Sequence, residues 1–165
     1  MGMPDFRFGA RVGAAMPKFG NMTVRDAAAF RFRLEEFKRH VQLRQHKLFQ
    51  RATAELLTKV VKANPVGNPS FWKKPRKGYV GGHSRRNWQM SRNPVVAEKP
   101  GTSEQQAMTD GYTAIAGMPV GIRKAYLSNP VPYMERLNKG WSRQAPAGWI
   151  DAALQQVIAK YRRAK

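Results

Sequence analysis

The longest periodic pattern of apolar residues lies in the first half of the chain. Apolar side chains recur there at steps of three, four or seven residues, at Phe30, Leu34, Phe37, Val41, Leu48, Ala52, Leu56 and Val60. This spacing places one apolar stripe along an α-helix. Thr23 followed by Asp26 is typical of a helix N-terminus, and Pro65 ends the pattern, so we predict a helix over residues 24–63.

The predicted helix is long for a chain of this size. At 1.5 Å per residue it would extend roughly 60 Å, which exceeds the diameter of a domain of this length. We therefore expect part of the helix to pack on another subunit, unless the helix bends. Leu and Phe residues on such a stripe are typical of a core or an interface rather than of a cofactor-binding motif.

Two short strands are predicted in the second half of the chain. Trp88 and Met90 alternate with polar residues, which is the period of a strand with one covered face, and Val95 and Val96 are candidates to extend it. Residues 120–128 indicate another strand, which ends where Asn-Pro follows. We expect these two strands to pair in a small antiparallel sheet.

Two further helices are predicted around that sheet. Ser103 with Gln106 forms a second capping signature, and helical spacing continues from there to Gly117. A last helix begins near Ala147 and carries one apolar face, formed by Ile150, Leu154, Val157, Ile158 and Tyr161. The predicted fold class is α+β: a long N-terminal helix and two shorter helices around a small antiparallel sheet.

The length and composition indicate one domain. The chain has 165 residues, 42% of them hydrophobic, which is enough for a single core. Residues 1–22 mix Gly, Pro, Met and Arg without a period, so we predict a flexible or partner-ordered arm there and a single domain over 23–165. No run approaches the roughly 20 apolar residues that cross a bilayer, and no signal peptide is expected.

The net charge of the chain indicates a polyanionic partner. Thirty Lys and Arg residues stand against ten Asp and Glu residues, which gives a net charge of +20. A surface with this charge repels itself unless a polyanion lies nearby, and that polyanion is usually nucleic acid. The absence of cysteine excludes disulfides, thiolate metal sites and cysteine nucleophiles.

The basic residues are dense in a loop over residues 64–86. Its Pro and Gly residues exclude a regular helix, and Phe71, Trp72 and Tyr79 argue against a purely disordered segment. The loop is the candidate contact surface for DNA or for a partner protein. Its candidate residues are Lys73, Lys74, Arg76, Lys77, Arg85 and Arg86.

Catalytic and metal-binding patterns are absent from the sequence. The three histidines have no metal-ligand spacing, and the adjacent Glu35 and Glu36 point in different directions on a helix. The turn over residues 81–84, Gly-Gly-His-Ser, is a weak candidate for binding a phosphate, with hairpin geometry as the alternative explanation. We predict no enzyme activity, no metal and no cofactor.

Two stretches of the sequence carry an order of residues that is typical of one known family. The first runs from Asn64-Pro65-Val66-Gly67 to Gly82-His83-Ser84-Arg85-Arg86-Asn87-Trp88, where a long helix gives way to the sheet. The second, residues 127–148, is similar to the pattern N-x-x-P-Y-x-x-x-L-E-x-G-x-S-x-Q-A-P-x-G. Its matching residues include Asn129, Pro132, Tyr133, Leu137, Gly140, Gln144, Pro146 and Gly148, while Asn138 stands where the family commonly has Glu. These patterns resemble the neck and tail-completion family, which includes minor tail protein Z of lambda-like phages.

The resemblance implies an α+β structural subunit of the virion. Such subunits form a ring with copies of themselves at the head-to-tail joint, next to head-completion or connector proteins and tail-terminator or tail-tube proteins. Packaged double-stranded DNA passes nearby, and sequence-independent phosphate contacts would give the charge of +20 a cause.

Two other functions stay open. A free basic nucleic-acid-binding protein would use the same loop, with its aromatic residues stacking on bases. A nuclease ranks third, because the sequence has no carboxylate cluster for Mg²⁺.

Overall fold

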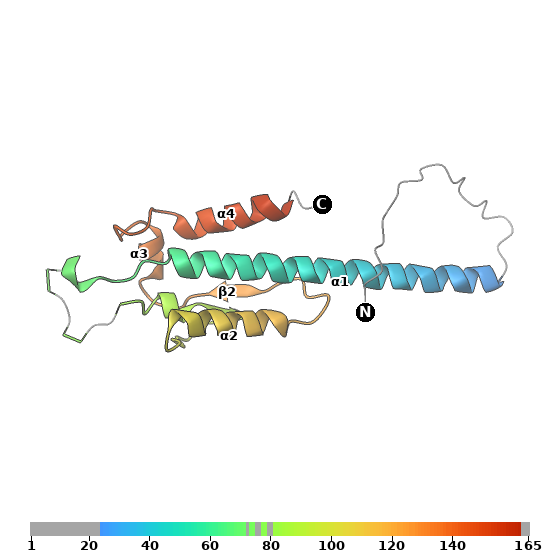
Figure 1. Ribbon diagram of the computed structural model, residues 1–165, viewed down its shortest axis with the longest axis horizontal. Helices are drawn as coiled ribbons and strands as arrows, with labels where there is room; N and C mark the ends of the chain where they lie inside the picture. The colour runs from blue at the N-terminus through green and yellow to red at the C-terminus, as the bar shows by residue number, and fades with distance from the viewer. Residues whose placement is uncertain (1–23, 72, 75–76, 79–80, 163–165) are drawn as a thin grey trace, which may run out of the picture. The chain divides into compact units, whose positions relative to one another are not determined.

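A computed structural model of the protein describes residues 24–71, 73–74, 77–78 and 81–162. The chain divides into two units, residues 1–39 and residues 40–165. The first helix, α1, begins in the first unit and ends in the second (Figure 1). The elements in order are α1 (Val24–Ala63), η2 (Pro69–Phe71), η3 (Arg85–Asn87), β1 (Gln89–Ser91), α2 (Glu104–Ala116), β2 (Tyr126–Ser128), α3 (Met134–Asn138) and α4 (Trp149–Arg162).

The predicted fold class is confirmed. The protein has a long N-terminal helix, shorter helices and a small antiparallel sheet, and α1 has the predicted bounds. The short helix α3 adds to the two shorter helices that the fold class named. The boundary between a predicted arm (1–22) and a domain (23–165) stays a prediction, because residues 1–23 lie outside the described residues.

The sheet consists of two antiparallel strands that are far apart in the sequence. Met90 of β1 lies opposite Leu127 of β2, and Met90 is buried. The second strand is shorter than residues 120–128, because in a turn the amide of Ile122 donates a hydrogen bond to the carbonyl of Pro119 at 3.2 Å. Gly121 has a φ of +88°, which no extended strand residue adopts. Pairing therefore begins only at Tyr126.

Helix α2 begins and ends as the sequence predicts. The hydroxyl of Ser103 accepts a hydrogen bond from the amide of Gln106 at 3.0 Å, which satisfies one free N–H of the first turn. At the other end, the amide of Gly117 donates to the carbonyl of Thr113 at 3.0 Å. Both ends of α2 are thus fixed by local hydrogen bonds.

The core of the second unit forms around the last three turns of α1. Leu57, Val60 and Val61 are almost completely buried there, and α2 and α4 lie on either side of this part of α1 (Figure 1). Trp88 and Trp149 meet edge to face, with ring centroids 6.3 Å apart. Burial of these large apolar side chains supplies most of the driving force for folding.

Only the C-terminal end of the apolar stripe predicted on α1 packs in the core. Leu48, a member of the stripe, is 39% exposed, while Leu57 is fully buried. Nine residues at about 100° each place these two side chains on opposite sides of the helix. The stripe is therefore largely exposed up to Leu48, whereas Leu56 packs against the core and Val60 is buried in it.

The packing face of α4 is also rotated from the predicted one. Trp149, Ala153 and Val157 are buried, whereas Leu154 and Ile158 are exposed. The sequence pattern missed this because Ala153 is small enough to let α4 approach the core closely, and small residues contribute little to an apolar period.

Polar contacts fix α4 against α1. The ammonium of Lys160 lies 2.6 Å from a carboxylate oxygen of Glu55, and the hydroxyl of Tyr161 donates to the same oxygen at 3.1 Å. The hydrogen bond from Lys160 holds the pKa of the Glu55 carboxyl below its usual value. Farther along, Lys59 donates to the side chain of Gln156 at 2.9 Å. These pairs show that the two helices run antiparallel.

Candidate functional site

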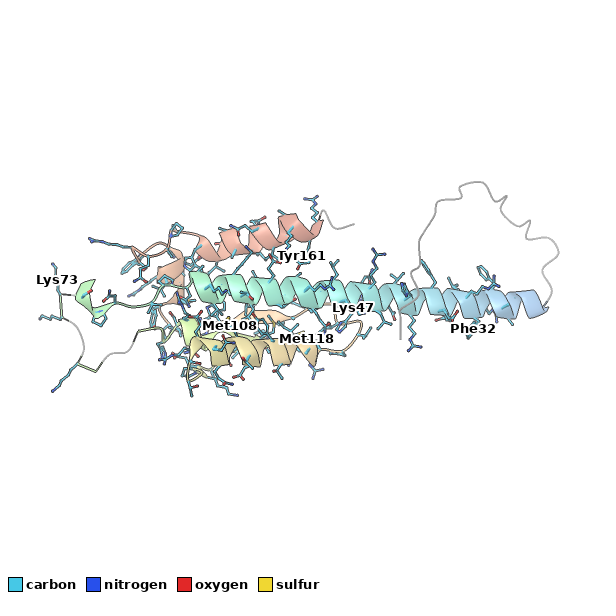
Figure 2. The ribbon with its side chains drawn as sticks, viewed as in Figure 1. Phe32, Lys47, Lys73, Met108, Met118 and Tyr161 are labelled. Carbon is cyan, nitrogen blue, oxygen red and sulfur yellow. The ribbon has the colours of Figure 1, made fainter. Side chains whose placement is uncertain are left out.

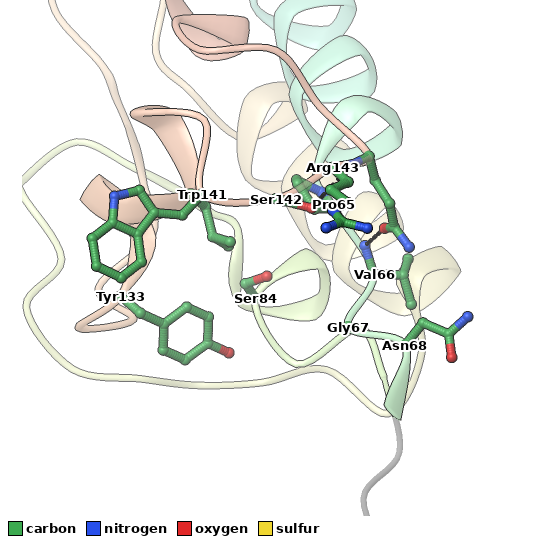
Figure 3. Close-up of a pocket in the computed structure, with 11 residues that line it drawn as sticks. Pro65, Val66, Gly67, Asn68, Ser84, Tyr133, Trp141, Ser142 and Arg143 are labelled. Atoms are coloured by element: carbon green, nitrogen blue, oxygen red, sulfur yellow. Dashed lines mark hydrogen bonds between the residues drawn. The ribbon is translucent and has the colours of Figure 1, made fainter. Parts of the chain in front are cut away.

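The two stretches that carry the family resemblance meet around one cavity in the second unit (Figure 3). The cavity has a volume of about 520 Å³. It is lined by residues of the first stretch, Pro65, Val66, Gly67, Asn68 and Ser84, and of the second, Tyr133, Leu137, Trp141, Ser142, Arg143 and Gln144. Every lining residue thus belongs to one stretch or the other, although residues 89–126 separate the two in the sequence.

Two hydrogen bonds tie the stretches together. The side-chain oxygen of Gln144 accepts from the amide of Val66 at 2.8 Å. The side-chain amide of Asn129 donates to the carbonyl of Ser84 at 2.7 Å. Both polar side chains belong to the predicted family pattern, and each satisfies a main-chain group of the other stretch. They therefore hold the loop between α1 and β1 against the segment between β2 and α4.

Asn138 joins α3 to α4. Its side-chain oxygen accepts from the amide of Ile150 at 3.1 Å, and its side-chain nitrogen donates to Asp151 at 3.1 Å. The first amides of a helix lack partners within the helix, so Asn138 satisfies one of them at the start of α4. Asn138 stands where the family pattern commonly has Glu. Because the side chain of Asn138 is uncharged, it can contact Asp151 without placing two carboxylates side by side.

The other predicted pattern residues shape the turns beside the cavity. Pro132 precedes α3, and Pro146 lies exposed shortly before α4. Gly140 and Gly148 have φ values of +86° and +73°, which favour glycine, and a Cβ on Gly140 would come within 3.2 Å of the amide nitrogen of Ala147. Because Met134 is the buried residue of α3, Tyr133 and Leu137 are left to line the cavity.

Arg85 and Arg86, predicted to lie near DNA or a partner, contact the protein itself. The guanidinium of Arg85 donates to the carbonyl of Asn64 at 2.7 and 2.9 Å and to that of Lys62 at 3.1 Å. It also forms an ion pair with Glu104 at 3.0 Å. Arg85 thereby satisfies carbonyls at the C-terminus of α1, which have no partner within the helix. Arg86 donates to the carbonyl of Thr102 at 3.4 Å.

The lysines of the loop have the exposure that a contact surface needs. Lys73, Lys74 and Lys77 are exposed, and Lys73 projects from the loop (Figure 2). Arg76 lies outside the described residues, as do the side chains of Phe71, Trp72 and Tyr79. Among the described residues, the DNA prediction for this loop therefore rests on three lysines rather than on the two arginines.

The turn that was a weak candidate for binding a phosphate has a structural explanation. A Cβ on Gly81 would lie 2.4 Å from the carbonyl oxygen of Gly67, so only glycine allows these two backbone segments to meet. His83 lies 2.6 Å from a carboxylate oxygen of Glu98. A carboxylate at this position repels a phosphate and disfavours anion binding at the turn.

Trp141 and Arg143 lie in the second stretch at positions that the family pattern leaves open, and both line the cavity. Trp141 is 73% exposed, and the guanidinium of Arg136 lies 5.2 Å from the centroid of its ring. Tyr133 and Trp141 stand at one end of the cavity, with Pro65 and Arg143 toward the other end (Figure 3). An exposed tryptophan is rare, and its position one residue after the turn glycine Gly140 is the sequence signal that marks it.

Comparison of the chain with protein-family models, with curated protein sequences and with solved structures finds no match. Within the described residues, no group of three or more His, Asp or Glu side chains is placed to hold a metal ion. Likewise, none of the helices that the structure describes combines the length and the apolar character needed to cross a membrane.

Proposed function

We propose that this chain is a non-enzymatic structural protein of a tailed-bacteriophage virion, a neck or tail-completion subunit at the head-to-tail joint. The observation that carries the proposal is the convergence of the two stretches with the family resemblance. They enclose one cavity and are tied together through Gln144 and Asn129. Residues that match a pattern by chance have no reason to gather in one place, so their convergence favours a common structural role.

The charge supports a position beside packaged DNA. Duplex DNA presents one phosphate per roughly 1.7 Å, and a ring of subunits with +20 each would face it through contacts that do not depend on base sequence. Such contacts suit a channel through which DNA slides. Among the described candidate residues of the loop, Lys73, Lys74 and Lys77 are exposed, whereas Arg85 and Arg86 are half-buried.

The ring would use apolar surface that the single chain leaves exposed. Leu154 and Ile158 lie one turn apart on α4, and both side chains are exposed. Neighbouring connector and tail proteins would contact other faces. This arrangement assigns assembly to the helices and DNA contact to the loop.

The test is assembly of particles. In a phage that lacks this protein, we expect filled heads and finished tails to accumulate separately, and adding the purified full chain should join them. Electron microscopy and infectivity measure both outcomes. If particles without the protein still joined heads to tails and stayed infectious, the proposed function would be wrong.

Charge reversal in the loop should weaken DNA binding without unfolding the protein. Replacing Lys73, Lys74, Arg76 and Lys77 by Glu removes candidate phosphate contacts, and each lost contact should reduce the salt slope of duplex binding by about 0.9. A fluorescence titration of duplex DNA at several salt concentrations measures this slope.

A matched control separates local contacts from net charge. Replacing Arg92, Lys99, Arg123 and Lys124 by Glu changes the net charge equally at four exposed positions outside the loop. We expect the loop variant to lose several times more affinity than the control and to keep the same urea midpoint. Equal losses in both variants, or a loss of soluble protein from the loop variant alone, would contradict DNA contact by the loop.

A further inference from the structure

The first unit exposes an aromatic surface on α1. Phe30, Leu34 and Phe37 are 50%, 40% and 59% exposed, and their spacing of four and three residues places them on one side of the helix. We call these three residues the α1 apolar face. Exposed aromatic side chains gathered in this way are typical of a protein–protein contact, where Phe, Tyr and Trp are enriched.

Basic side chains border the α1 apolar face. Arg33 lies three residues after Phe30 and four before Phe37, and Arg31 lies three before Leu34, so both arginines are helix neighbours of the face. No ion pair forms at Arg31 or Arg33 among the described residues. The surface therefore combines an apolar centre with positive edges.

The charge distribution argues against a second copy of this chain as the partner. The chain has only ten Asp and Glu residues, and at least five of them are engaged in internal ion pairs: Glu35, Glu55, Glu98, Glu104 and Glu135. Another copy can offer few carboxylates to the arginines and carries a net charge of +20 itself. Close packing of two such faces would bring like charges together.

The shape of the apolar face argues against a lipid surface. Its three side chains fall within about 60° of the helix circumference, whereas a helix lying on a membrane needs a wide apolar face. Phe32 is 66% exposed and, at about 100° per residue, lies about 200° from Phe30, on the opposite side of the helix. Glu35 and Glu36 on the remaining surface would be repelled by anionic lipids.

We propose that the α1 apolar face binds a different protein, through an apolar surface on that partner that is bordered by carboxylates. Phe30, Leu34 and Phe37 supply the buried contact, and Arg31 and Arg33 pair with the carboxylates at its edge. The inference goes beyond the proposed function, since it defines the chemistry of one partner and holds whether or not that partner belongs to a virion.

The test uses the full chain and two synthetic amphipathic peptides. Both have Leu at the a and d heptad positions, and one has Glu and the other Lys at the flanking e and g positions. We expect the Glu peptide to bind and to gain helical circular dichroism on binding. Its affinity should fall as the salt concentration increases. The Lys peptide should not bind. Fluorescence anisotropy of labelled peptides measures both affinities.

Matched variants locate the contact. Phe37→Gln should weaken binding of the Glu peptide at least tenfold, whereas Phe32→Gln, which changes the same residue type on the opposite side, should change it less than twofold. Urea denaturation checks that both variants stay folded. The proposal is overturned if the Glu peptide does not bind, if the two variants lose binding equally or if both peptides bind alike.

Two further results would replace the proposed partner with another one. Self-association of the chain in light scattering that Phe37→Gln abolishes would assign the face to a second copy. Binding to phosphatidylserine vesicles that Phe37→Gln abolishes would assign it to a membrane. Either result overturns the proposal, and neither bears on whether the protein joins phage heads to tails.

Discussion

Replacing Arg85 by Met should lower the free energy of unfolding by about 3 kcal/mol and leave the affinity for DNA almost unchanged. The guanidinium of Arg85 donates to the carbonyls of Lys62 and Asn64 and pairs with Glu104. Asn64 is fully buried, so its carbonyl finds no water when the arginine is removed. Methionine keeps an unbranched apolar stem and removes every donor. The urea midpoint and a DNA titration measure the two effects.

Three further variants define the cause. Arg92→Met removes the same charge at an exposed position and should change stability by less than about 0.5 kcal/mol. Arg85→Lys keeps the charge but loses the planar guanidinium that reaches two carbonyls and a carboxylate. Its free energy of unfolding should therefore lie between those of Arg85→Met and the wild type. Glu104→Gln breaks only the ion pair and should cost about 1 kcal/mol or less. A stable Arg85→Met variant that binds DNA weakly would instead make Arg85 a contact residue.

The bounds of α1 and α2 could be predicted because their signals are local. Ser103 and Gln106 lie three residues apart, and the hydrogen bond between them needs no other part of the chain. Gly117 ends α2 in the same local way. The end of α1 before Pro65 likewise follows from what proline does to its own neighbourhood. Local rules of this kind require no knowledge of the fold.

The packing faces could not be predicted, because they depend on which elements meet. An apolar period on α1 gives the same pattern whether the face packs in the core or on a partner, and the structure leaves Leu48 exposed while it buries Leu57. The role of Arg85 was hidden for a similar reason. In a run of basic residues, an arginine that satisfies helix carbonyls has the same sequence signature as one that contacts solvent or DNA.

Individual residues of the candidate site could be predicted from the sequence, but the contacts between them could not. Gln144 and Asn129 stood out through the family pattern, but nothing in the sequence indicates that they bind the main chain at Val66 and Ser84. Contacts between residues this far apart arise only when β1 and β2 pair and α3 turns back toward the end of α1. The cavity is a consequence of that tertiary arrangement.

At the contact between α1 and α2, the effect of Gly111→Ala on stability should depend on whether Leu57 is present. A Cβ on Gly111 would lie 2.4 Å from Cδ2 of Leu57, a side chain that is fully buried and surrounded by the core. Gly111→Ala should therefore lower the free energy of unfolding by about 1–3 kcal/mol, because the leucine has little room to move. Leu57→Ala should lower it by about 2–5 kcal/mol, because it removes buried methyl groups and leaves a cavity.

The double variant should be more stable than Leu57→Ala alone. With the leucine shortened, the new Cβ at position 111 meets no obstacle and fills part of the cavity. Alanine also favours a helix over glycine by about 1 kcal/mol, a gain that the clash conceals in the wild type. Gly111→Ala is thus expected to destabilise the wild type and to stabilise Leu57→Ala, which urea denaturation of all four proteins measures directly. If the two losses of stability were additive, the side chains at positions 57 and 111 would not compete for the same space. The distance between α1 and α2 would then be larger than the 2.4 Å approach of the Gly111 Cβ to Leu57 implies.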